Sequence, residues 1–249
     1  MISRDLHVHT TFSDGKNTPE EVVLEAIKKG VKTLGFSDHT YTPFDTSYCM
    51  KKEKVDEYIK QVNALKEKYH EKIEILCDIE QDYFAGKPTH NFDYVIGSVH
   101  YIKLGDEYID VDDTAEKLQN AAKKYFGGDI YSLIEEYYRL VGEVVNTTNA
   151  DIIGHFDLIT KFCEKENIFD QNNLRYVAAW QKAADKLLKA NKPFEINTGA
   201  ISRGYRTTPY PAPQIIDYIK QNGGRFILSS DSHSADTVMF GFSEKLLKD

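Results

Sequence analysis

The chain has 249 residues, of which 41% are hydrophobic and 28% charged, a composition typical of a globular protein with a sizeable core. Its formal net charge of −8 and its pI near 5.5 argue against a nucleic-acid-binding or membrane-binding surface, because both favour basic patches. No run of about 18 apolar residues predicts a membrane span.

Short β-rich runs alternate with amphipathic helical stretches along the chain. We expect strands at Asp5–Val8, Thr33–Ser37, Ile73–Ile79, Tyr94–Val99, Asp151–Gly154, Pro193–Asn197 and Arg225–Ser229. Helices are expected at Pro19–Lys29, Lys52–Tyr69, Ile130–Asn146, Asn173–Ala190 and Pro213–Gln221. Repeated strand-then-helix order predicts parallel strands with helices outside them. Seven such units without a break in composition favour one α/β domain over residues 1–249, a closed or nearly closed barrel, with a doubly wound open sheet as the alternative fold.

The region from Tyr101 to Gly128 has no clear assignment. Acidic residues come first, and a helix-like stretch, Thr114–Tyr125, follows. We interpret this region as a surface excursion, with a lid over a site as the alternative.

The N-terminus and the cysteines indicate the compartment. Met1 to Asp5 lead straight into His7, which leaves no room for a secretion signal. The three cysteines, Cys49, Cys77 and Cys163, are widely separated and form no CxxC pair. They are typical of free thiols and not of disulfides or a zinc knuckle. We therefore expect a cytoplasmic protein.

The placement of the eight histidines is the strongest functional signal. Two of them, His70 and His90, are expected at the surface. The other six lie at or just beyond the end of a predicted strand: His7, His9, His39, His100, His155 and His233. His7 and His9 are two residues apart in an extended segment, so both side chains can reach one ion. Because the carboxyl ends of barrel strands converge on one mouth, six histidines there predict a metal site.

Carboxylates join this pattern. Glu80 and Asp231 also follow or end predicted strands, and Asp14 completes a set of nine potential ligands. Mixed imidazole and carboxylate ligands suit zinc, manganese or iron better than calcium or magnesium. We therefore expect two to three divalent transition-metal ions. With three ions, the three carboxylates leave a net charge of about +3, which suits a phosphate dianion and a bound hydroxide.

These motifs resemble those of the polymerase and histidinol phosphatase (PHP) family. The resemblance runs over nearly the whole chain, in order and in spacing, through Asp5–Thr10, Ser13–Gly15, Ser37–His39, Glu80, His100, Gly154–His155 and Asp231–His233. It implies a distorted, TIM-like barrel of about seven βα units.

By position, the resemblance also implies a ligand set for each ion. His7, His9, Glu80 and Asp231 would bind one ion, Glu80, His100 and His155 a second with Glu80 bridging, and Asp14, His39 and His233 a third. Asp14 departs from a histidine-bearing pattern that many members carry nearby, which leaves the affinity for the third ion open.

Further segments resemble the stand-alone histidinol-phosphatase branch of the family: Ile79–Tyr83, Asp93–His100, Gly154–Ile159 and Glu195–Thr198. The motifs of polymerase-linked relatives are absent from the sequence. The resemblance implies a phosphomonoesterase that converts L-histidinol phosphate to L-histidinol and phosphate in histidine biosynthesis. One alternative is a PHP phosphoesterase for another small phosphate ester or a nucleotide. A non-catalytic metal-binding domain is the other, although the complete ligand set argues against it.

The catalytic candidates are Glu80, Asp231 and His233. A hydroxide that bridges the first two ions would act as nucleophile, since metal binding lowers the pKa of water toward about 7. Asp231 could accept the proton of the nucleophile or only bind an ion. His233 could protonate the leaving group or bind an ion, and we favour the ligand role.

Cations in two mouth loops are candidates for phosphate binding. Arg203 and Arg206 follow the sixth predicted strand, and Lys161 lies six residues after His155. Bidentate arginine contacts fit phosphate geometry, whereas solvated loop arginines are the alternative. Tyr41 and Phe44 are interpreted as packing residues and not as walls of an imidazole site. We expect a small-molecule phosphate ester as partner, no nucleic acid and no membrane; formation of a homo-oligomer stays open.

Overall fold

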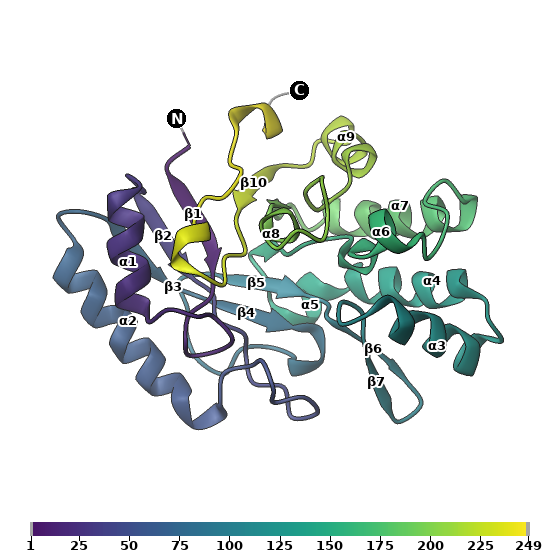
Figure 1. Ribbon diagram of the computed structural model, residues 1–249, viewed down its shortest axis with the longest axis horizontal. Helices are drawn as coiled ribbons and strands as arrows, with labels where there is room; N and C mark the ends of the chain where they lie inside the picture. Colours follow the sequence, from purple (N-terminus) through teal and green to yellow (C-terminus); the bar gives the residue numbers. More distant parts are fainter. Residues whose placement is uncertain (1, 248–249) are drawn as a thin grey trace.

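Parallel strands lie at the centre of the computed structural model, between two groups of helices (Figure 1). The structure describes residues 2–247, so Met1 and residues 248–249 of the expected single domain lie outside the described residues. The strands are β1 (Arg4–Val8), β2 (Thr33–Phe36), β3 (Glu74–Cys77), β4 (Ile79–Asp82), β5 (Val95–Ser98), β6 (Tyr101–Leu104), β7 (Glu107–Asp110), β8 (Ile152–Ile153), β9 (Phe194–Asn197) and β10 (Phe226–Ser229).

Two parallel sheets make up the barrel wall. One has the strand order β1-β2-β3 and the other β10-β9-β8-β5-β4. Only Asp78 separates β3 from β4, so these two strands form one kinked strand position. A parallel bridge between His39 and Glu80 joins the sheets on one side, and a parallel bridge between Val8 and Ser232 joins β1 to the end of β10. The described strands therefore close a ring of seven positions, and the predicted distorted β/α barrel is confirmed.

Helices cover the outside of this ring. They are α1 (Pro19–Lys28), α2 (Val55–Tyr69), α3 (Ala115–Phe126), α4 (Ile130–Val141), α5 (Val144–Thr148), α6 (Cys163–Glu166), α7 (Leu174–Leu188), α8 (Gly199–Ser202) and α9 (Pro213–Gln221). The start of α1 follows directly from its sequence, because Thr18 and Glu21 form a capping box around Pro19. The apolar faces of α1 and α2 pack against β2 in one buried cluster.

A small apolar layer fills the barrel below its mouth. Its residues come from strands all around the ring and touch one another: Leu6, Leu76, Tyr94, Ile96, Ile152 and Ile227. Side chains from opposite strands can meet only inside a barrel, so this layer lies in the interior. On β5, the next inward positions after Ile96 are Ser98 and His100, since side chains alternate along a strand. The layer therefore closes the bottom of the mouth where the predicted ligands lie.

The unassigned region from Tyr101 to Gly128 contains an antiparallel hairpin and a helix. β6 pairs with β7 across a turn at Gly105, whose φ of +61° favours glycine. The predicted helical stretch corresponds to α3. The end of the hairpin and the segment after it bring Asp110, Asp112 and Asp113 to the mouth of the barrel, where these residues line a cavity.

The predicted helix Ile130–Asn146 is two helices, α4 and α5, which are separated around Gly142. A Cβ atom at Gly142 would lie 3.4 Å from the Cα atom of Ala183, so α7 approaches the chain closely there. The three cysteines are free and buried, as expected. Within the described residues, no helix combines the length and the apolar character that a membrane crossing requires.

Candidate metal centre

All nine predicted ligands meet at the carboxyl ends of the strands. Strand β1 carries His7 and precedes His9 and Asp14, β4 carries Glu80, and β2, β5 and β8 are followed by His39, His100 and His155, while Asp231 and His233 follow β10. Contacts between nitrogen and oxygen atoms of at most 4 Å link all nine side chains into one network. The structure therefore brings together every residue that the sequence predicted as a ligand.

The Glu80 carboxylate lies at the centre of this network. Its Oε2 atom is 3.2 Å from His7 Nε2 and 3.6 Å from His9 Nε2. Its Oε1 atom faces the other way, 2.9 Å from His155 Nε2 and 3.4 Å from His100 Nε2. Oε2 also lies 2.9 Å from His39 Nδ1, so Glu80 contacts imidazoles of all three predicted groups of ligands. The two oxygens face different imidazoles, which suits a carboxylate that would bridge two ions.

A second carboxylate, Asp231, faces the first of these groups. Its Oδ1 atom lies 3.2 Å from His9 Nε2 and 3.8 Å from His7 Nε2. Asp231 has a left-handed backbone, with a φ of 47°, which few residues other than glycine, asparagine and aspartate adopt. Gly199 makes room for it, since a Cβ atom at Gly199 would lie 2.8 Å from Asp231 Oδ2.

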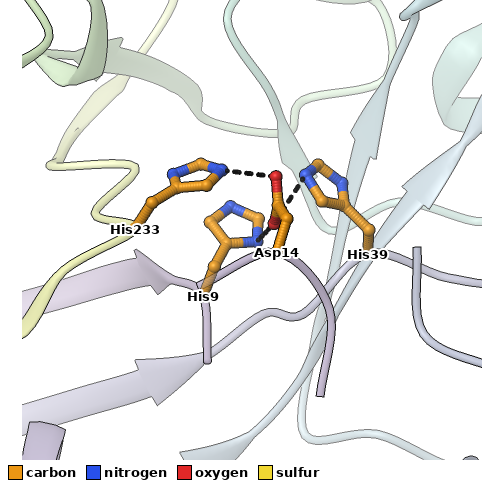
Figure 2. A group of neighbouring side chains, drawn as sticks. All are labelled: His9, Asp14, His39 and His233. Carbon is orange, nitrogen blue, oxygen red and sulfur yellow. Dashed lines mark ion pairs between the residues drawn. The ribbon is translucent and has the colours of Figure 1, made fainter. Parts of the chain in front are cut away.

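Figure 2 shows the third group, in which the Asp14 carboxylate lies between the imidazoles of His39 and His233. Asp14 Oδ2 is 3.1 Å from His233 Nε2, and Asp14 Oδ1 is 3.7 Å from His39 Nε2 and 3.9 Å from His9 Nδ1. The loop that carries Asp14 is held by the buried Asp38, which accepts hydrogen bonds from the backbone and hydroxyl groups of Thr10 and Ser13.

Several buried atoms of the cluster lack a hydrogen-bond partner. They are His7 Nε2, both ring nitrogens of His9, and Glu80 Oε2. An unpaired polar atom costs free energy when it is buried, and most such atoms in native proteins are paired. Three sets of these side chains place one donor atom each within 4.8 Å of one another: His9 with Asp14, His39 and His233; His7 with His9 and Glu80; and His39 with Glu80 and His100. The residues therefore fit divalent metal ions.

The electrostatics of the cluster favour added positive charge. Burial opposes the charged form of His7, but Glu195, Glu80 and Asp231 outweigh it and raise the pKa of His7 well above its usual value. Burial, together with the neighbouring His233 and His39, lowers the pKa of His9 to about 3. Burial alone would raise the pKa of Glu80, yet the surrounding imidazoles hold it well below the usual range. Bound cations would supply the charge that protons otherwise bring to this site.

A cavity of about 290 Å³ opens beside the ligands. Arg203 lines it and donates hydrogen bonds to the backbone oxygen and to Oδ2 of Asp231, at 2.9 and 3.1 Å. Lys161 also lines the cavity, where its Nζ atom donates to Asp112 Oδ2 at 2.8 Å. The loops after β8 and β9 thus bring two of the three predicted phosphate-binding cations to the site.

Arg206 lies elsewhere. Its guanidinium donates to Thr160 Oγ1 at 2.7 Å, lies 3.6 Å from Asp157 Oδ2, and stacks over the ring of Tyr210. The side chain is 3% exposed and is not part of the cavity wall. These contacts tie two mouth loops together, so the structure does not bring Arg206 to the predicted phosphate site.

A family model confirms what the motifs indicate. The PHP domain model matches residues 5–199, which is more than half of the chain and contains seven of the nine candidate ligands. The chain belongs to the PHP domain family.

Curated relatives and solved structures that are similar to this PHP domain carry the names of histidinol phosphatases. A protein of Deinococcus radiodurans named "Probable histidinol-phosphatase" is 28% identical over 96% of this chain and 90% of its own length. A Listeria monocytogenes protein assigned as a histidinol phosphatase has a TM-score of 0.81 at 20% identity, over 97% of this chain and 99% of that chain, which shows the shared fold. The histidinol phosphate phosphatase of Lactococcus lactis, solved with zinc, L-histidinol and phosphate, has a TM-score of 0.59 at 25% identity, over 94% of this chain and 87% of that chain.

For two groups of residues at the site, the sequence predicted no functional role. The first is acidic and lines the same cavity as Arg203: Asp45, Asp110, Asp112 and Asp113. Its members lie in loops and in a short hairpin, where no strand periodicity points to them. The second group contacts ligands from behind: Glu195 accepts from His7 Nδ1 at 2.7 Å, and Asp82 lies 3.2 Å from His100 Nδ1. A charged residue inside the apolar strand Phe194–Asn197 is the signal that could have revealed Glu195.

The first prediction compares the central carboxylate with the peripheral one. Glu80→Gln should lower the number of divalent ions bound per chain more than Asp14→Asn, because the Glu80 carboxylate lies within 4 Å of five imidazoles and the Asp14 carboxylate within 4 Å of three. Elemental analysis of the two variants beside the parent protein measures this difference. Equal ion content in Glu80→Gln and the parent would remove Glu80 from the centre of the site.

Proposed function

We propose that this PHP domain protein is a metal-dependent phosphomonoesterase that hydrolyses L-histidinol phosphate to L-histidinol and phosphate in histidine biosynthesis. The observation that carries the proposal is the convergence of nine metal-binding side chains beside a cavity that Arg203 and Lys161 line. The name of the Deinococcus radiodurans relative and the L-histidinol and phosphate bound to the Lactococcus lactis enzyme support this substrate. The reaction would take place in the cytoplasm.

Two to three divalent transition-metal ions, zinc, manganese or iron, are the cofactors that the ligands would hold. The sets are His7, His9, Glu80 and Asp231; Glu80, His100 and His155; and Asp14, His39 and His233. When bound, such ions polarise phosphoryl oxygens and lower the pKa of a water molecule that attacks phosphorus. The zinc found in the structure of the similar Lactococcus lactis enzyme favours zinc among the three candidate metals.

The contacts of Asp231 favour a role as ligand over a role as proton acceptor. Its Oδ1 atom faces His9, while its Oδ2 atom accepts a hydrogen bond from Arg203. Burial opposes the ionised form, but Arg203 and His7 lower the pKa of Asp231 well below its usual range. A carboxylate held in this state stays ionised, so it binds cations well and accepts protons poorly.

His233 is also arranged as a ligand. Its Nδ1 atom lies 2.9 Å from Arg203 Nη1, which can only donate, and 3.0 Å from the backbone oxygen of Asp231, which can only accept. An ion bound at Nε2 would select the tautomer in which Nδ1 donates its proton to the Asp231 oxygen. Nε2 then carries the lone pair and faces Asp14 in the third group. This arrangement favours a ligand role over protonation of the leaving group.

Arg203 and Lys161, the cations among the residues predicted to bind phosphate that line the cavity, are the groups we assign to phosphate binding. Arg203 lies against Asp231 and His233, so its guanidinium borders the ion cluster and can turn a free N–H toward a phosphoryl oxygen. Lys161 adds a second cation, although Asp112 already neutralises part of its charge. Charge-assisted contacts of this kind orient the phosphoryl group and stabilise the charge that moves to its oxygens.

The acidic side of the cavity favours a substrate that also carries a positive charge. Asp110 lines the cavity, and no Lys, Arg or His of residues 2–247 lies within ion-pair distance of it. Burial, together with the neighbouring Asp112, raises the pKa of Asp110 and so favours its neutral form, whereas an ammonium group bound beside it would stabilise the ionised form. L-Histidinol phosphate brings an ammonium group and an imidazole with its phosphate. A nucleotide would bring further negative charge, which this wall repels.

The direct test is a phosphate-release screen over a panel of phosphomonoesters that includes L-histidinol phosphate, with metal analysis of the same sample. We expect L-histidinol phosphate to have the highest kcat/KM. A strong chelator should abolish the activity, and added zinc, manganese or iron should restore it, because the site holds the ions that activate water. Full activity of metal-free protein would rule out this chemistry, and preference for another ester would favour the alternative phosphoesterase.

The phosphate contact of Arg203 can be tested against Arg206 in the same loop. Arg203→Ala should lower kcat/KM by about one to two decades, because a hydrogen bond to a charged group contributes roughly 1.5–3 kcal/mol. Arg203→Lys should recover only part of the loss, since it cannot make bidentate contacts. Arg206→Ala is the control: it should lower the thermal stability and leave kcat/KM close to the parental value. The opposite result, a loss of kcat/KM in Arg206→Ala alone, would place the phosphate contact at Arg206.

The acidic wall predicts a substrate-specific effect. Asp110→Asn should raise KM for L-histidinol phosphate about tenfold, which corresponds to one lost charge-assisted contact of about 1.4 kcal/mol. KM for glycerol phosphate, which lacks an amine, should stay unchanged. Asp113→Asn serves as the control, because Asp113 lies in the same wall but already pairs with Lys117. Equal effects of Asp110→Asn on both substrates would show that Asp110 does not recognise the cation.

A further inference from the structure

Glu195 lies directly behind the metal ligands, on the inward face of β9. The residue is 1% exposed, and both of its carboxylate oxygens are engaged. Oε1 lies 2.7 Å from His7 Nδ1. Oε2 accepts the backbone N–H of His155 at 3.1 Å and a side-chain N–H of Asn197 at 3.3 Å. One buried carboxylate therefore accepts three N–H groups.

The contact with His7 determines which ring nitrogen can bind an ion. A carboxylate accepts hydrogen bonds, so in the neutral form of His7, which binds an ion, the proton resides on Nδ1 and the lone pair on Nε2. The Nε2 atom is buried without a hydrogen-bond partner and faces Glu80 Oε2 and Asp231 Oδ1. Histidines that bind metals commonly donate their second N–H to a carboxylate in this way, which fixes the tautomer and the ring orientation.

The same carboxylate reaches two other candidate ligands. Its bond to the backbone of His155 fixes the chain from which the His155 imidazole extends to Glu80 Oε1. Asn197 donates to Glu195 and also lies 3.3 Å from Asp231 Oδ2, so it links the two carboxylates. His7, His155 and Asp231 are all predicted ligands of the two metal ions that Glu80 would bridge. Within residues 2–247, the hydrogen bonds and ion pairs of Glu195 do not extend to Asp14, His39 or His233.

We propose that Glu195 is a positioning residue that holds the ligands of the two-ion site centred on Glu80 and leaves the site around Asp14 largely independent. The proposal rests on the metal binding proposed above, and not on the identity of the substrate. Glutamine has one carbonyl oxygen and an NH2 group in place of the two carboxylate oxygens. In Glu195→Gln the NH2 group must face an N–H donor, at His7 in one amide orientation and at His155 and Asn197 in the other.

The test measures ion binding and does not depend on catalysis. Metal-free parent and Glu195→Gln are each loaded with cobalt(II) and titrated with a competing chelator, while the visible absorption of cobalt follows the coordination of each site. We expect the ions of the Glu80-centred site to bind about 10- to 100-fold more weakly in the variant. The ion held by Asp14, His39 and His233 should keep its parental affinity. Glu195→Asp keeps the charge but shortens the side chain, so it should recover part of the affinity.

Asp5→Asn provides a matched control. Asp5 is a fully buried carboxylate on β1 that accepts hydrogen bonds from the backbone and hydroxyl groups of Ser230 and from the backbone groups of Met239 and His7, so none of these contacts involves the side chain of a candidate ligand. Its replacement makes the same chemical change at the same depth, and ion affinity should stay within a few fold of the parent. Thermal unfolding of the metal-free variants compares their stability.

Three results would overturn the proposal. Unchanged cobalt affinity in Glu195→Gln would show that Glu195 does not position the ligands. Equal weakening in Glu195→Gln and Asp5→Asn would show a general effect of a buried amide. A metal-free Glu195→Gln protein that is unfolded where metal-free parent and Asp5→Asn are folded would assign Glu195 to the barrel core. A protein that binds ions as expected but does not hydrolyse L-histidinol phosphate would contradict the proposed function and leave the role of Glu195 intact.

Discussion

The buried carboxylate of Glu80 is the group on which the rest of the site depends. It is 1% exposed, and Oε1 accepts a hydrogen bond from Ser98 while both oxygens face imidazoles. A buried anion is costly unless positive charge compensates it. The surrounding histidines can compensate it only by taking up protons or by sharing divalent ions with it. The same residue also contributes to the barrel, since its bridge to His39 joins the two sheets. The backbone of Glu80 therefore helps to close the ring, while its side chain lies at the centre of the ion site.

The ligand set could be predicted from the sequence because two simple rules apply to it. Side chains alternate along a strand, and parallel barrel strands end at one mouth, so polar residues at strand ends must come together. These rules do not predict where the side chains of Arg203 and Arg206 lie. Both follow β9 in one short loop, but Gly204 between them has a φ of +72° and turns the chain, and the buried Asp157 attracts Arg206 away from the cavity. Neither the turn nor the distant carboxylate is visible in the local sequence.

The acidic residues that line the cavity could not be predicted from the sequence, for a related reason. Asp110 and Asp112 belong to a hairpin end and the segment after it, and their sequence pattern is that of an ordinary exposed segment. Only the tertiary position of the β6–β7 hairpin brings them to the cavity. Glu195 differs, because an ionisable residue within an apolar strand needs a buried partner, and the strand period already places it inside the barrel. The sequence shows that such a partner must exist, but not that it is His7.

The outer carboxylates also change the charge of the site. Three carboxylates among the ligands and three divalent ions would leave an excess of about three positive charges, enough to bind a phosphate dianion and hydroxide tightly. Glu195 and Asp82 stand directly behind His7 and His100 and offset about two of these charges. A smaller excess still attracts the phosphate ester but retains the phosphate product less strongly, which matters because product must leave before the next turnover. In the proposed reaction, Asp110 would attract the ammonium group of the substrate but not inorganic phosphate, which carries none. A charge outside the metal cluster would then favour the substrate over the phosphate product.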